Sequence, residues 1–382
     1  MPVWDGDRLH VFFQHNPDEA RWGNMHWGHA SSADLLRWEL HPHALAPDGP
    51  HDHAGVFTGC VVRDGDTWWA FYTGVTGLKP LEQLQCAARS RDLSSWEKLP
   101  APLLDRPPAG FAGCWRDPLV WHDDGWHMLL GAEQGGGAAL HYAATDLDRW
   151  RYRGVFYADH YGDTGIEFEC PDLLTLGRQQ VLLTSASAHR SGPWKRSYVH
   201  LLQPSAGSSR YRRSWTALDT GCLYAVRTAH LGPRLLFGWI EERRSEADQL
   251  ASGWSGVLSL PRELYLRGRE VCQRPWSGLR RLRGAHQRLE ARTVHQPWSL
   301  GAPIGEELRL RSSGPLRLRI GDHELVVPQH ARELALFVDR SVVELVPDRG
   351  PSHTARVYGA DRELVLRAPE PVTVEGDRWT LG

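Results

Sequence analysis

The sequence predicts an all-β protein, a five-bladed β-propeller followed by a C-terminal β-sandwich. Two observations lead to this fold class. A unit of about 55 residues recurs along the first part of the chain, and past Leu266 the pattern changes to strands in which apolar residues alternate with arginine. No stretch shows a convincing 3.6-residue period, so short strands are the expected building blocks of both parts.

Each repeat combines an apolar stretch, a turn with glycine, and a run rich in aromatic and β-branched residues. The turn glycines lie 52 to 60 residues apart and are Gly6, Gly65, Gly125, Gly177 and Gly232. Asp-Leu-x-x-Trp recurs with a similar period and begins at Asp34, Asp92 and Asp146. We expect its aspartate to shape a turn and its tryptophan to pack between blades. Five such units predict a propeller over residues 1–272, with an incomplete first inner strand.

The second part of the chain reads as a connector and a sandwich. Residues 273–284 are rich in Pro, Gly and Arg, which predicts a linker. Residues 285–382 contain strands such as 308–311 and 316–320, where leucine alternates with arginine. Alternation of this kind is typical of strands with one solvated face, as in a β-sandwich. We expect the arginines of these strands to form that face: Arg309, Arg311, Arg317 and Arg319.

Composition bounds the possible partners. The 382 residues carry 44 Lys+Arg against 46 Asp+Glu, so neither a nucleic-acid nor a membrane partner is expected. No apolar stretch approaches the roughly 18 residues of a membrane span, and the acidic start differs from a signal peptide. Cytoplasmic location is the expectation for the chain as written, with secretion left open by the incomplete first strand. No metal or other cofactor is expected, because His51-Asp52-His53 lacks a helical partner motif. The sequence does not indicate an oligomeric state.

Two carboxylates stand out when the repeats are compared. The eighth residue before each turn glycine is Phe57, Asp117, Glu169 or Tyr224 in the second to fifth repeats. Equivalent positions on the inner strands of adjacent blades would bring Asp117 and Glu169 together near the propeller axis. Two carboxylates in an aromatic-lined funnel suit glycoside hydrolysis, where one protonates the leaving oxygen. The alternative is that both are ordinary turn and ion-pair residues.

Several segments resemble glycoside hydrolase family 32, the invertase, levanase and inulinase group of β-fructofuranosidases. The resemblance covers nearly the whole chain. Its segments are Phe12-Phe13-Gln14-His15-Asn16-Pro17, Trp22-Gly23-Asn24-Met25-His26-Trp27, Phe57-Thr58-Gly59-Cys60, Arg116-Asp117-Pro118, Glu169-Cys170-Pro171 and Phe337-Val338-Asp339-Arg340-Ser341-Val342-Val343-Glu344. The fold of that family agrees with the one predicted from the repeats.

The resemblance implies hydrolysis of β-fructofuranosidic bonds in sucrose or fructans by a retaining mechanism. It implies that Glu169 is the general acid/base, that Asp117 hydrogen-bonds fructose hydroxyls, and that Arg116 holds Glu169 or the sugar. Cys170 would pack beside the acid. The other residues implied for the fructose subsite are Gln14, Trp22, Phe57, Thr58 and Trp239. Burial near Asp117 should raise the pKa of Glu169.

One departure from the family concerns the nucleophile. Members carry it in Asn-Asp-Pro-Asn-Gly, just before the strand that reads Pro2-Val3-Trp4 here, so we expect the nucleophilic Asp upstream of Met1. Asp5 and Asp7 are poor substitutes, because they occupy the turn at the far end of that strand. Three interpretations stay open: an enzyme whose sequence is truncated at the N-terminus, a catalytically inactive fructan-binding propeller, and a related arabinan- or xylan-acting hydrolase.

Smaller departures affect the predicted substrate. Thr58 and Cys60 replace the usual serines of the family, and residues 223–227 are a loose version of its Phe-Tyr-Ala segment. These changes leave the fructose subsite intact but blur the side that takes the leaving group. The substrate therefore stays open among sucrose, sucrose 6-phosphate, inulin and levan, as does the choice between hydrolysis and transfructosylation.

Overall fold

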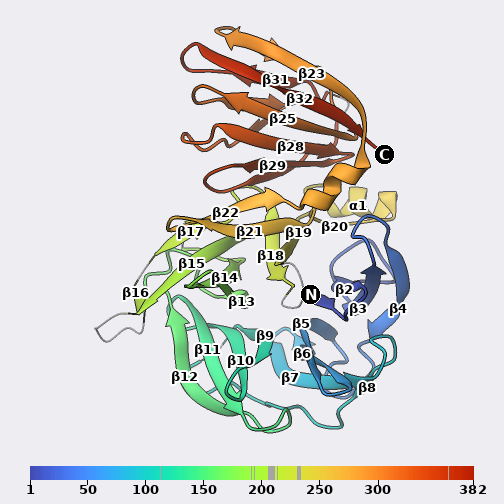
Figure 1. The fold of residues 1–382 in the computed structure, drawn as a ribbon. Helices are drawn as coiled ribbons and strands as arrows, with labels where there is room; N and C mark the ends of the chain where they lie inside the picture. Colours follow the sequence, from blue (N-terminus) through green and yellow to red (C-terminus); the bar gives the residue numbers. More distant parts are fainter. Residues whose placement is uncertain are drawn as a thin grey trace. The chain divides into compact units, whose positions relative to one another are not determined.

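The computed structural model describes residues 1–111, 113–190, 192, 194–204, 211–212, 214–229, 234–359 and 361–382 (Figure 1). Their contacts define two compact units. The first comprises Met1–Trp215, Ala225–Arg234 and Arg244–Gly256, and the second comprises Thr216–Tyr224, Leu235–Arg243 and Val257–Gly382. Gly232, the turn glycine expected in the fifth repeat, lies outside the described residues.

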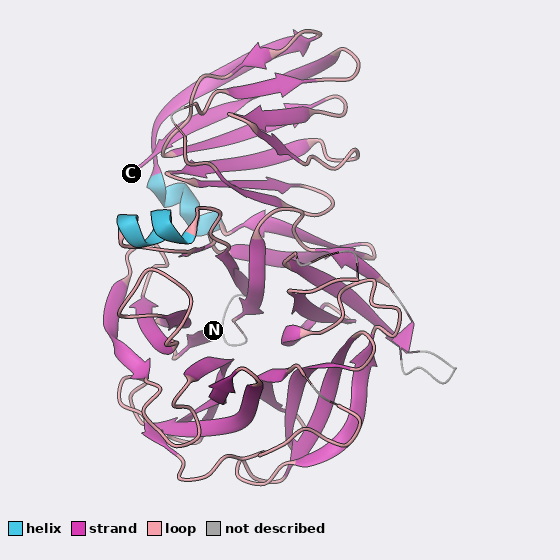
Figure 2. Cartoon of the chain, turned by 180° about the vertical axis from the view of Figure 1, so that it is seen from behind, coloured by secondary structure: helices cyan, strands magenta, loops and turns pink. Residues whose placement is uncertain are grey.

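Four sheets of the first unit follow one another along the chain, and strands dominate both units (Figure 2). The first sheet contains β1 (Pro2–Trp4), β2 (Leu9–His15), β3 (His26–Ser32) and β4 (Glu39–Leu45). The second contains β5 (Gly55–Asp64), β6 (Thr67–Leu78), β7 (Leu81–Ser90) and β8 (Glu97–Lys98). The third contains β9 (Trp115–His122), β10 (Trp126–Glu133), β11 (Gly137–Ala144) and β12 (Arg151–Ala158). The fourth contains β13 (Glu169–Leu176), β14 (Gln179–Ala186), β15 (Arg196–Pro204), β16 (Tyr211–Arg212) and β17 (Trp215–Ala217).

The fifth sheet completes the series of blades. It contains β18 (Leu223–Thr228), β19 (Leu235–Ile240), β20 (Val257–Leu258), β21 (Arg262–Arg267) and β22 (Glu270–Pro275). All pairings described within these five sheets are antiparallel between strands that are close in sequence, as successive hairpins require. The predicted fold class, five propeller blades followed by a sandwich, is confirmed.

Two of the three Asp-Leu-x-x-Trp segments, those that begin at Asp92 and Asp146, have the structural role expected of them. The Asp92 carboxylate accepts hydrogen bonds from the backbone N–H groups of Ser94 and Ser95, at 2.9 and 2.8 Å. Trp96 then packs edge-on against Phe12 of the first sheet, with ring centroids 5.8 Å apart. Trp150 makes the same type of contact with Phe71 of the second sheet, at 5.9 Å. Each tryptophan therefore joins its own blade to the preceding one.

A short helix, α1 (Glu246–Ser252), belongs to the first unit and has a cap at each end. The Ser245 hydroxyl accepts a hydrogen bond from the Asp248 N–H, and Gly253 ends the helix at φ 72°. Among the described residues, no helix combines the length and the apolar character needed to cross a membrane.

The sandwich consists of two sheets in the second unit. The larger contains β23 (Arg283–Val294), β32 (Val372–Leu381), β25 (Glu306–Ser312), β28 (Glu333–Asp339), β29 (Val342–Pro347) and β30 (His353–Arg356). The smaller contains β24 (Trp298–Ser299), β31 (Leu364–Arg367), β26 (Arg317–Ile320) and β27 (His323–Leu325). Their shared core includes the fully buried Leu308 and Leu336 from the larger sheet and Leu318 and Leu366 from the smaller one.

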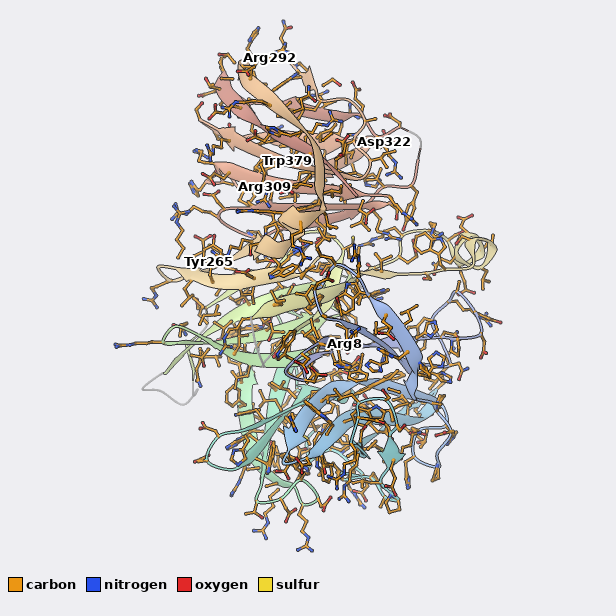
Figure 3. The ribbon with its side chains drawn as sticks, turned by 45° about the vertical axis from the view of Figure 1, so that its right-hand side comes forward. Arg8, Tyr265, Arg292, Arg309, Asp322 and Trp379 are labelled. Atoms are coloured by element: carbon orange, nitrogen blue, oxygen red, sulfur yellow. The ribbon has the colours of Figure 1, made fainter. Side chains whose placement is uncertain are left out.

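The arginines that alternate with these leucines lie away from the core, as expected. Arg309 and Trp379 project from neighbouring strands in Figure 3. Arg309 donates to the carboxylate of Glu307 at 2.5 Å, and Arg311 lies 3.7 Å from Glu333. Because carboxylates accompany these cations, the face is mixed in charge rather than uniformly basic.

The segment predicted to be a linker is structured. β22 pairs with β21 as far as Pro275, opposite Arg262, and a 3-10 helix, η1 (Ser277–Leu282), follows at once. Leu279 in this helix is buried, which explains why the segment is ordered despite its Pro, Gly and Arg content.

Candidate active site

One irregularity recurs on the innermost strands β5, β9 and β13. In each, two residues face a single residue of the partner strand, which is a β-bulge. The bulged pairs are Phe57-Thr58, Asp117-Pro118 and Cys170-Pro171. Asp117 and Cys170 have left-handed φ values of 63° and 49°, which non-glycine residues seldom adopt. Such strained bulges re-aim side chains and are concentrated near active sites.

The bulges correct the register deduced from the turn glycines. They align Asp117 with Cys170, and Arg116 with Glu169, so the expected equivalence of Asp117 and Glu169 is wrong by one residue. The cause is the place of the glycine in the turn. Gly125 is the last of the three residues between the paired ends of β9 and β10, whereas Gly177 is the first of the two between those of β13 and β14. Counting back eight residues from each turn glycine therefore gives positions that differ by one residue between the third and fourth blades.

The structure brings Arg116 and Glu169 into direct contact. An Nη2–H of Arg116 donates a short hydrogen bond to Oε1 of Glu169, and Nη1–H donates to Oε1 of Gln83 at 3.3 Å. The side chains of Arg116 and Glu169 are only 12% and 14% exposed. A charge-assisted bond with this little exposure orients the glutamate firmly.

Asp117 lies beside this pair and is 4% exposed. Its Oδ2 accepts a hydrogen bond from the Cys170 N–H at 2.9 Å and lies 3.5 Å from the Cys170 thiol. Its own N–H donates to the Thr73 hydroxyl at 3.0 Å, and its carbonyl oxygen accepts from Arg227 at 3.0 Å. Asp117 is thus fixed from three strands, and Cys170 packs against it.

Burial raises the pKa of Glu169 to about 6. Arg116 opposes this shift because its positive charge favours the carboxylate, while the negative charges of Asp117 and Glu167 add to it. A carboxyl group with a pKa of about 6 can hold a proton in mildly acidic solution and release it at neutral pH.

Aromatic residues predicted for the sugar subsite gather on and around β5. Trp22 is 61% exposed, and its ring meets Phe57 edge-on at a centroid distance of 5.7 Å. Phe57 is buried, with Thr58 next to it in the same bulge, and the Trp27 indole donates to the Phe57 carbonyl at 2.9 Å. An exposed indole that packs on a buried, hydrogen-bonded residue is suited to stacking on a sugar ring.

Two further predicted residues come from other strands. Gln14 is half-buried on β2, opposite Trp27 of β3. Trp239 lies on β19 in the second unit, where its ring is 6.4 Å from that of Tyr224. The structure thus brings together Arg116, Asp117, Glu169 and Cys170, and it places Phe57 and Thr58 on the adjacent inner strand.

Sequence reasoning missed two residues that contact Arg116. Gln83 comes from β7 and Glu167 from the segment just before β13, with Oε2 3.7 Å from Nη2 of Arg116. Glu167 had a detectable signal, because residues two apart in an extended chain face the same side and Glu169 was already singled out. Among the described residues, no group of three or more His, Cys, Asp or Glu is arranged to hold a metal ion.

A buried, arginine-bound glutamate able to carry a proton, beside a fixed aspartate in a propeller, defines a glycoside hydrolase type of site. Residues 2–275 match the family model described as "Glycosyl hydrolases family 32 N-terminal domain". The chain therefore belongs to glycoside hydrolase family 32, and the predicted enzyme class is confirmed.

Curated relatives and solved structures agree with this assignment. The chain is 30% identical to the sucrose-6-phosphate hydrolase of Escherichia coli, over 100% of this chain and 91% of the relative. It is 32% identical to the raffinose invertase of Escherichia coli, over 99% and 91%. The structure of the Bombyx mori GH32 beta-fructofuranosidase BmSUC1 is similar with a TM-score of 0.81 at 26% identity, covering 100% of this chain and 90% of that one. Fructan 1-exohydrolase IIa from Cichorium intybus has the same fold, with a TM-score of 0.83 at 20% identity over 100% and 94%.

Proposed function

We propose that this chain hydrolyses the β-fructofuranosidic bond of sucrose-type substrates, with Glu169 as the general acid/base. The observation that carries the proposal is the placement of Glu169, held by Arg116 beside the buried Asp117, with its pKa raised by burial to about 6. The names of the relatives support the substrate class, since they include a sucrose-6-phosphate hydrolase and a raffinose invertase. A BmSUC1 variant was solved in complex with sucrose.

In the proposed reaction, protonated Glu169 gives its proton to the glycosidic oxygen while the bond from that oxygen to the fructosyl carbon breaks. A retaining mechanism needs a second carboxylate that bonds to the fructosyl carbon. That nucleophile stays a prediction of the family resemblance. In the second step, ionised Glu169 takes a proton from water, whose oxygen displaces the nucleophile and releases fructose.

Asp117 is assigned to binding rather than to proton transfer. Cys170 occupies its Oδ2, and no hydrogen bond to Oδ1 is found among the described residues. We assign Oδ1 to a hydrogen bond from a fructose hydroxyl. Trp22 and Phe57 would supply the apolar wall of the same subsite, with Gln14 and Thr58 as its further members.

Sugar release and sugar binding should be measured on one preparation. Glucose or fructose release from sucrose, sucrose 6-phosphate, inulin and levan tests turnover, and calorimetry with the same sugars tests binding. The assay should include the chain preceded by the residues that its gene encodes in frame upstream of Met1. Release of sugar from sucrose, with β-fructofuranose as the first anomer seen by NMR, is the expected result. Binding without release from either form would contradict the proposal and support a carbohydrate-binding protein.

A further inference from the structure

Glu167 and Glu169 share one cation. Nη2 of Arg116 bonds Oε1 of Glu169 and lies 3.7 Å from Oε2 of Glu167. The two glutamates flank Phe168, whose ring is fully buried, so both carboxylates emerge on the opposite side of the chain from that ring. Phe168 is pinned to the third sheet, because its N–H donates to the Ala132 carbonyl at 3.0 Å.

Glu167 is also fixed from its other side. The hydroxyl of Ser187 donates a short hydrogen bond to Oε1 of Glu167, and the Glu167 side chain is only 13% exposed. Its two oxygens are therefore divided between a neutral donor and Arg116. A surface glutamate that met arginine by chance would be more exposed and free to turn away.

We propose that Glu167 is a positioning residue that neutralises part of the charge of Arg116, so that Glu169 can hold its proton. This inference rests on the proposed function, in which Glu169 is the acid/base. If Arg116 served Glu169 alone, the full positive charge would favour the ionised carboxylate and remove the proton needed for the acid step.

Other charged and titratable groups of the described residues surround the pair. They are Asp117 on β9, Glu133 at the end of β10, Cys114 before β9, Cys170 on β13, His189 and Arg196 around the β14–β15 hairpin, Arg227 on β18, and the amino group of Met1. Asp117 and Glu167 both raise the pKa of Glu169, whereas Arg116 lowers it. Loss of Glu167 removes one of the two repulsions and releases Arg116 to Glu169, so both effects lower the Glu169 pKa.

The test compares Glu167→Gln with Ser187→Ala. The first removes the charge of Glu167 and keeps its shape, and the second removes its hydrogen-bond donor and keeps its charge. The Glu169 carboxyl is titrated by NMR in 13C-labelled full-length chain, with its resonance identified by its absence in Glu169→Gln. We expect Glu167→Gln to lower the Glu169 midpoint by about one pH unit, a tenfold smaller protonated fraction at a given pH above the midpoint. Ser187→Ala should leave the midpoint within about 0.3 unit of the parent.

An unchanged midpoint in Glu167→Gln, or equal shifts in both variants, would overturn the inference, because a merely structural glutamate would behave in one of these ways. Glu167→Ser removes the same charge with a smaller side chain and serves if the glutamine variant unfolds. The NMR midpoint needs no turnover, so absence of sugar release from both forms of the chain would contradict the proposed function without changing this result. In an active chain, the basic limb of the pH profile of kcat/KM should move down with the midpoint.

Discussion

Arg262 anchors a buried ionic network in the second unit, and its replacement by methionine should cost more stability than any surface charge. Its side chain is fully buried, as is that of Asp219, and Glu344 is 2% exposed. Arg262 donates to Glu344 through Nε at 3.0 Å and through Nη2, and Nη1 lies 3.4 Å from Asp219. Its further acceptors are Gln273, Ser352 and Thr354.

The magnitude follows from what Arg262→Met would leave behind. Asp219 would keep hydrogen bonds from Ser352 and Thr354, but Glu344 would keep only the Leu260 N–H at 2.8 Å among the contacts described. Breaking a buried ion pair from one side costs about 3–5 kcal/mol, because the remaining charge is uncompensated. For a unit of this size class, that corresponds to a fall in Tm of roughly 6–20 °C.

Urea unfolding followed by tryptophan fluorescence, together with calorimetric Tm, measures this loss. Arg267→Met is the matched control, because Arg267 is 51% exposed and lies 3.3 Å from Asp348 at the surface. The control should lose less than about 1 kcal/mol. If Arg262→Met loses no more unfolding free energy than Arg267→Met, the network does not stabilise the second unit.

Three further predictions concern the first unit. Burial lowers the pKa of His200 to about 3, so only the unfolded chain takes up a proton at this histidine as the pH falls below about 6.5. Between pH 7 and 4.5, His200→Gln should therefore lose roughly 2–3 kcal/mol less unfolding free energy than the parent. Equal shifts of the urea midpoint in the variant and the parent would contradict this. Trp22→Ala should weaken calorimetric sucrose binding about tenfold or more with Tm unchanged, because Trp22 is exposed and its ring meets that of Phe57; unaltered affinity would remove Trp22 from the subsite. A Cβ on Gly131 would lie 2.1 Å from the Phe168 carbonyl oxygen, so Gly131→Ala should cost more than about 2 kcal/mol by urea unfolding, and a fully stable variant would show that the strand before the acid is free to shift.

Much of the fold could be predicted from the sequence, because propeller blades repeat their chemistry. Trp96 and Trp150 do pack between blades, as the Asp-Leu-x-x-Trp period suggested. Residues 273–284, predicted as a linker from their composition, are ordered, since burial of Leu279 and strand pairing to Pro275 outweigh a composition typical of loops. Tertiary contacts of this kind leave no local pattern in the sequence.

The sequence predicted which residues form the candidate site better than it predicted how they are arranged. Comparison of the repeats singled out Asp117 and Glu169, but the glycine stands last in one turn and first in the other, which displaced their register by one residue. The left-handed conformation of Asp117 is imposed by the bulge and has no residue signature of its own. The contacts of Gln83 and Glu167 with Arg116 depend on three separate segments, so spacing within one repeat could not show them.

Replacement of Glu169 by glutamine shows whether this residue carries the proton for glycoside cleavage. Initial rates of glucose release from sucrose are measured at pH 5.5 for Glu169→Gln and its parent, in the form of the chain that shows turnover. The amide keeps the shape of the side chain and can still accept from Arg116, but it has no proton to donate. Loss of a general acid predicts a fall in kcat of about 10²–10⁴-fold with sucrose affinity retained. A variant that hydrolyses sucrose within threefold of the parent rate would contradict the account.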